Sequence, residues 1–96
     1  MKHENKKFWR KNERDVCKQL GLRPVPGSGA GMEKEDGEND YILCQLKSTD
    51  AASYQLRKLD VEKLLYHAEV DCKIPLFVIQ FMDTTMPLLA LTPVDE

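Results

Sequence analysis

The chain has 96 residues, of which 42% are hydrophobic, and its formal net charge is −2. This length predicts one domain, residues 1–96, with a small core. No run of about 18 apolar residues occurs, and charged residues follow the first methionine, so we expect neither a membrane span nor secretion.

Charge is distributed unevenly along the chain. Residues 1–23 contain eight Lys or Arg and three acids, whereas residues 33–40 contain five acids and one Lys. A basic element beside an acidic pocket suits a protein that binds phosphates with one surface and a metal ion with the other. The alternative is a solvated helix face followed by a solvated loop.

Residues 5–20 have the pattern of an amphipathic helix. Phe8, Val16 and Leu20 fall on one stripe, and Gly21 is placed to end the helix. A short extended segment, residues 22–26, is expected next because its two prolines exclude helix.

A loop rich in Gly and Ser occupies residues 27–31. Such a loop either presents free amide groups to a phosphate, with Ser28 beside them, or is a plain linker. No Gly-Lys-Ser/Thr sequence closes it, so it is not a Walker loop, and we expect no nucleotide cofactor.

Residues 41–47 have the composition of a strand, preceded by a predicted turn at residues 37–40. Alternation places Gln45 and Lys47 on one face of this strand. A hairpin folded at the turn brings Asp36 beside them. A carboxylate, an amide oxygen and an ammonium together can hold a divalent cation beside a phosphate.

The second half of the chain predicts a polar segment at residues 48–55, a helix capped by Asp60 and ending near Val70, and two strands at residues 74–81 and 88–91. His67 lies off the expected buried stripe, which favours a solvated position. The predicted class is therefore α/β, in the order α-β-β-β-α-β-β, with a mixed central sheet flanked by two helices.

Four pieces of the sequence match a known arrangement of motifs. They are, in chain order, Glu13-Arg14, Gly27-Ser28-Gly29-Ala30, Asp36 and Gln45-Leu46-Lys47-Ser48-Thr49. At these positions the chain resembles the PD-(D/E)XK nuclease superfamily, and within it the small archaeal and phage Holliday-junction resolvases. The likeness covers roughly residues 5–92. Position 45 is commonly Glu in that family and is Gln here, and the family proline before the metal-binding Asp is replaced by Glu35.

The resemblance implies a restriction-endonuclease-like αβββαβ core and a Mg²⁺-dependent site that Mn²⁺ can also fill. Asp36 and Gln45 would bind the metal, with the Leu46 carbonyl as a further ligand and Asp40 as the alternative to Asp36. Glu13 would hold a metal-bound water or a second ion, and Lys47 would act on the attacking water or the phosphate. The residues expected to contact DNA are Arg10, Arg14, Ser28, Gly29, Ser48, Thr49, Tyr54 and Lys58.

The implied function is hydrolysis of phosphodiester bonds in branched DNA by a homodimeric Holliday-junction resolvase. The alternatives are a less selective nickase or restriction-like nuclease acting on duplex DNA, and a DNA- or partner-binding module that has lost cleavage. Three widely spaced cysteines without a CxxC pair predict reduced thiols, and hence a cytoplasmic protein, in the host cytoplasm if it is phage-encoded.

Overall fold

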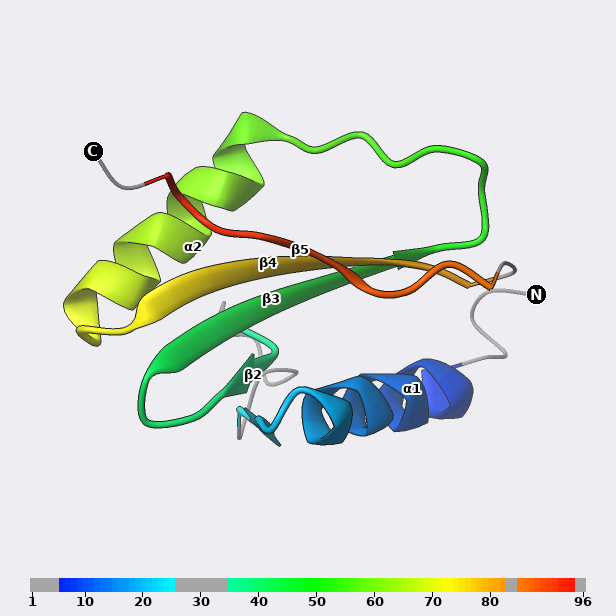
Figure 1. Cartoon of the computed structure of the whole chain (residues 1–96), viewed down its shortest axis with the longest axis horizontal. Helices are drawn as coiled ribbons and strands as arrows, with labels where there is room; N and C mark the ends of the chain where they lie inside the picture. The colour runs from blue at the N-terminus through cyan, green and yellow to red at the C-terminus, as the bar shows by residue number, and fades with distance from the viewer. Residues whose placement is uncertain (1–5, 26–34, 83–84, 95–96) are drawn as a thin grey trace.

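A computed structural model describes residues 6–25, 35–82 and 85–94, with side chains from Lys11 onward. It is an α/β domain, as predicted, and its elements follow the predicted order (Figure 1). They are α1 (Lys6–Gln19), β1 (Arg23–Pro24), β2 (Gly37–Glu38), β3 (Ile42–Thr49), α2 (Lys58–Val70), β4 (Ile74–Phe81) and β5 (Leu89–Leu91).

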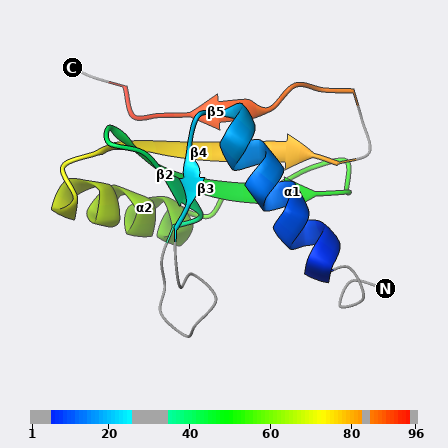
Figure 2. The same cartoon turned by 90° about the horizontal axis from the view of Figure 1, so that it is seen from below.

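One mixed sheet runs through the domain in the order β1-β2-β3-β4-β5. The long central strands β3 and β4 are parallel and pair along their whole length, while the other neighbours are antiparallel. The two helices lie on opposite sides of the sheet (Figure 1). Seen from below, α1 crosses the strands obliquely (Figure 2).

The core forms two clusters because β3 presents alternate residues to the two helices. Cys44 packs with Cys17, Leu22 and Val78 on the α1 side. The cluster on the α2 side contains Leu43, Leu64, Ala68 and Phe77.

Helix α1 ends as its sequence predicts. Gly21 has φ +74°, and the Leu22 N–H donates to the Cys17 carbonyl at 2.7 Å. This is a Schellman end, in which Gly takes the left-handed position without a Cβ clash and Leu22 folds back onto Cys17.

Helix α2 begins earlier than predicted. Arg57, not Asp60, is its N-cap, and no side chain caps it. Asp60 lies in the first turn, where it pairs with Arg57 and is favourably placed toward the positive end of the helix.

The turn before β3 is also shifted from its predicted position. Gly37 and Glu38 belong to β2, and Asn39 makes the reversal by accepting hydrogen bonds from the Tyr41 and Ile42 amides at 2.8 and 2.7 Å. Asn is well suited to such a turn because its side chain substitutes for a backbone acceptor. The hairpin therefore closes two residues later, and Asp36 still lies against β3.

In the described part of the chain, no helix combines the length and the apolar character needed to cross a membrane.

Candidate active site

Asp36 directly precedes β2 and lies beside the part of β3 with which β2 does not pair. The β2–β3 pairing reaches only Leu43 and Cys44, and the Asp36 amide extends it by donating to the Cys44 carbonyl at 2.9 Å. Its carboxylate then accepts the next ladder donor, the Leu46 N–H, at 2.7 Å. Because N–H and C=O of one residue in an antiparallel ladder face the same neighbour, the Leu46 carbonyl also faces this edge.

Glu13 reaches the same place from the middle of α1. Its carboxyl group shares a hydrogen bond with that of Asp36. Burial raises the pKa of Asp36, although the Leu46 N–H, the Glu13 hydrogen bond and the charge of Lys47 each lower it. Two carboxyl groups this close cannot both ionise without cost, so the pair favours either a shared proton or a bound cation.

A cavity of about 200 Å³ adjoins Glu13 and is also lined by Asn12, Leu46 and Ser48. Gln80 organises its polar wall, because its side-chain oxygen accepts hydrogen bonds from Asn12 at 2.7 Å and from Ser48 at 3.0 Å. The space is therefore large enough for several water molecules and is bordered by groups that can bind them.

Gln45 and Lys47 project from the α2 side of the sheet, since their register partners are Phe77 and Ile79. They share one face, as predicted, but it is the face opposite Glu13. The charge of Lys47 nevertheless reaches Asp36 and lowers its pKa. A cation bound by Glu13 on one face and Gln45 on the other would have to lie at the edge of β3 beside Asp36, where β2 does not pair with it.

Two residues of this neighbourhood were not among the predicted site residues. Glu35 is only 6% exposed, and its carboxylate is 2.5 Å from Nδ1 of His67, which projects from α2. The expectation that His67 is solvated is wrong, because it is half-buried and paired with Glu35. A usable signal was its place between Leu64 and Ala68, on the flank of the buried stripe.

The structure separates Asp40 from the candidate site. Asp40 is exposed in the turn before β3, and the strand from Ile42 to Lys47 spans about 17 Å at the usual rise. Of the two predicted alternatives, Asp36 is the one beside Lys47.

The residues predicted to contact DNA lie in different parts of the structure. Arg14 is exposed on α1, and Ser48 lines the cavity. The Thr49 hydroxyl accepts the Ala51 N–H at 3.0 Å, which stabilises the start of the connection to α2. Ser28 and Gly29 lie outside the described residues, as does the side chain of Arg10.

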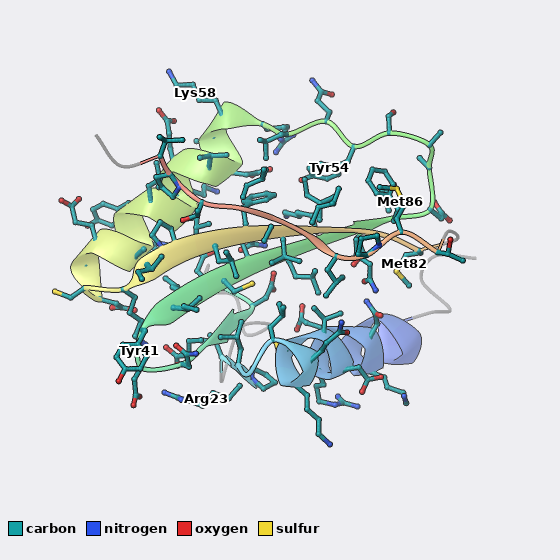
Figure 3. The ribbon with its side chains drawn as sticks, in the orientation of Figure 1. Arg23, Tyr41, Tyr54, Lys58, Met82 and Met86 are labelled. Atoms are coloured by element: carbon teal, nitrogen blue, oxygen red, sulfur yellow. The ribbon has the colours of Figure 1, made fainter. Side chains whose placement is uncertain are left out.

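Tyr54 and Lys58 lie on the α2 side of the sheet (Figure 3). The Tyr54 ring packs against Phe77, with centroids 6.5 Å apart, and therefore contributes to the core. Lys58 is at the exposed start of α2, 3.8 Å from Glu62. Neither side chain lies on the face that carries Glu13.

No protein-family model, curated protein or solved structure matches this chain. Among the described residues, no group of three or more His, Cys, Asp or Glu is placed to hold a metal ion. Mg²⁺ commonly binds through one or two carboxylates and keeps several waters. The carboxyl groups of Glu13 and Asp36, the Leu46 carbonyl and the adjoining polar cavity fit that requirement.

Proposed function

We propose that this protein is a Mg²⁺-dependent DNA endonuclease that hydrolyses phosphodiester bonds, with branched DNA such as a Holliday junction as its preferred substrate. The observation that carries the proposal is the pairing of Asp36 with Glu13 at an open strand edge, within reach of the charge of Lys47. Burial of Asp36 raises its pKa, and a cation bound beside the two carboxyl groups would oppose that shift.

The proposed mechanism assigns a separate task to each group. Asp36 and Glu13, with the Leu46 carbonyl, would hold the metal, and Gln45 would contribute its amide oxygen from the other face. Bound Mg²⁺ supplies charge neutralisation at the phosphate and a water of lowered pKa. Lys47 stabilises negative charge that develops on the phosphate, or orients the attacking water.

Basic residues on the α1 side support DNA binding there. Arg14 and Lys18 are exposed on α1. Arg23, which Figure 3 labels, is exposed on β1. Lys11 contributes less, because it pairs with Asp15 at 2.9 Å. Phosphates that meet these cations would bring the backbone toward the cavity beside Glu13.

An apolar groove on the opposite side supports a homodimer, which two symmetric incisions require. The groove lies between α2 and β5, has a volume of about 210 Å³, and includes Leu56, Leu65, Leu91 and Pro93. Three of these residues are Leu side chains 39–44% exposed. Since β5 is the sheet edge remote from β2, a partner there leaves the candidate site uncovered.

Charges near this groove are paired within the chain, which favours a second copy as the occupant. Arg57 pairs with Asp60, and Lys58 pairs with Glu62. Two identical surfaces of this kind meet without strong like-charge repulsion, and an apolar centre with a polar rim is the usual anatomy of an interface.

The test is cleavage of a labelled four-way junction and of the matching linear duplex, in Mg²⁺ and in EDTA. We expect metal-dependent cuts in the junction at a higher rate than in the duplex. Lys47→Ala should lower their rate about a thousandfold, a cost on the order of 4 kcal/mol of transition-state stabilisation. Equal cutting of both substrates would instead assign a less selective nickase, and no cutting in either would refute the nuclease proposal.

A second candidate function is a DNA-binding module of the same fold that has lost cleavage. The neutral Gln45 favours it, because an amide attracts a cation less strongly than a carboxylate does. Gln45→Glu separates the two. A module with a weakened site should gain cleavage, whereas a site adapted to the amide should show an unchanged or lower rate.

A further inference from the structure

Glu35 and His67 form a buried pair that the proposed mechanism does not use. The Glu35 carboxylate is 6% exposed, and its Oε2 lies 2.5 Å from Nδ1 of His67. Burying a carboxylate is unfavourable unless hydrogen bonds or charges compensate it.

The two adjacent acids, Glu35 and Asp36, contact different helices, and this places Glu35 on the same side of the sheet as Lys47. Asp36 meets Glu13 of α1, while Glu35, one residue earlier, meets His67 of α2. The backbone bends at Asp36, and the two adjacent acids reach opposite sides of the sheet. Lys47 projects from the α2 side, so Glu35 is the acid that shares its face.

The charge of Lys47 lowers the pKa of Glu35 as well as that of Asp36. A Lys ammonium sits on a flexible four-carbon stem, so its position depends on what attracts it. A fixed anion on its own face restricts it, and the Glu35 carboxylate is fixed by His67. His67 thus fixes an anion on the face of the sheet that carries the Lys47 ammonium.

We propose that Glu35 and His67 are positioning residues for Lys47. His67 orients the Glu35 carboxylate, which holds the Lys47 ammonium at the strand edge beside Asp36. The inference rests on the proposed nuclease function, because it concerns a residue of that same site. It assigns no contact with DNA or metal to either positioning residue.

Single-turnover cleavage of a labelled four-way junction tests this, using His67→Ala, His67→Gln and Glu35→Gln. His67→Ala and Glu35→Gln should lower the maximal single-turnover rate about 10- to 100-fold, with the half-saturating protein concentration and the Mg²⁺ midpoint within twofold of wild type. His67→Gln retains a donor for Glu35 and should recover much of the loss. Glu69→Gln, exposed on the same helix, is the matched control.

The deciding comparison repeats the substitutions in the Lys47→Ala background. If the pair acts through Lys47, Glu35→Gln should there have no further effect on the residual rate, on DNA affinity or on the Mg²⁺ midpoint. An undiminished effect, or a shifted Mg²⁺ midpoint, would overturn the inference while leaving the nuclease proposal intact. A wild-type protein that cleaves no DNA would instead refute the nuclease proposal, and this inference with it.

Discussion

At the residue scale, the ionised form of half-buried Asp36 opposes folding, because desolvation outweighs the groups that favour its charge. Burial raises its pKa above the value of 3.8 that an unperturbed Asp has. The proton-linked stability of this group is therefore fully present below pH 3.8 and is lost as the pH rises through the higher folded-state pKa. Ionised Asp36 without a cation thus destabilises the protein at neutral pH.

Asp36→Asn should consequently raise the melting temperature at pH 8 in EDTA by a few degrees. The amide oxygen can still accept the Leu46 N–H, and the amide nitrogen can donate to Glu13. The gain should shrink as the pH falls toward 4. Thermal unfolding followed by circular dichroism between pH 4 and 8 measures it, and a variant that melts lower at every pH would contradict this account of Asp36.

The three cysteines should differ in reactivity because two of them are buried and one is exposed. Burial raises the pKa of the Cys17 thiol to about 11 and that of Cys44 to about 12, with nearby acids contributing. Cys72 is exposed. One thiol should react promptly with a thiol reagent at pH 8, and three after denaturation. Prompt reaction of two or more thiols in the native protein would disprove the packing of Cys17 against Cys44.

At the scale of the elements, the two helix ends show what could be predicted from sequence. Gly21 predicted the end of α1, because helices commonly end at a residue with a left-handed backbone and Gly is the usual residue there. The same Schellman end closes α2, where the Lys73 N–H donates to the Ala68 carbonyl at 2.8 Å, but its left-handed residue is Cys72 at φ 57°. The predicted end near Val70 is confirmed, whereas the left-handed conformation of Cys72 was not predicted because that position does not carry Gly.

Cys72→Gly should therefore stabilise the protein by about 1 kcal/mol, since a residue with a Cβ is strained in this conformation. Urea unfolding measures the change in the free energy of unfolding. Gln55→Gly, at an exposed position in the connection before α2, is the control. A Cys72→Gly variant less stable than wild type would show that the side chain contributes more than the strain costs.

The candidate site was predictable in part. The strand alternation and the hairpin were enough to place Asp36 against β3 and Lys47 near it. The pairing of Asp36 with Glu13, and of Glu35 with His67, depends on where each helix crosses the sheet, which a linear pattern does not specify. The shift of the turn to Asn39 arose because side-chain capping at Asn competes with the Gly-based turn.

For the whole molecule, the sheet has two unlike edges. The edge near β2 carries the candidate site, and the groove beside β5 carries exposed apolar residues. If two copies associate through the groove, Leu91→Glu should convert a dimer into a monomer, because it places a charge in the apolar centre. Sedimentation equilibrium measures the mass, and Tyr41→Glu, exposed in the turn before β3, is the control.

The result that would contradict this arrangement is a Leu91→Glu protein with the mass of the wild type. A dimer that persists would place the interface elsewhere. A wild-type monomer would leave the groove without its proposed occupant and remove the support for two symmetric incisions.

The proposed function depends most on Asp36, with Glu13 and Lys47 beside it, being a metal-dependent catalytic site. The most direct measurement is the single-turnover rate at which Asp36→Asn, compared with wild type, cleaves a labelled four-way junction at saturating Mg²⁺. We predict a rate at least about a thousandfold lower, in a protein that remains folded and binds the junction. Equal rates for the two proteins would contradict the assignment of this cluster as the site of cleavage.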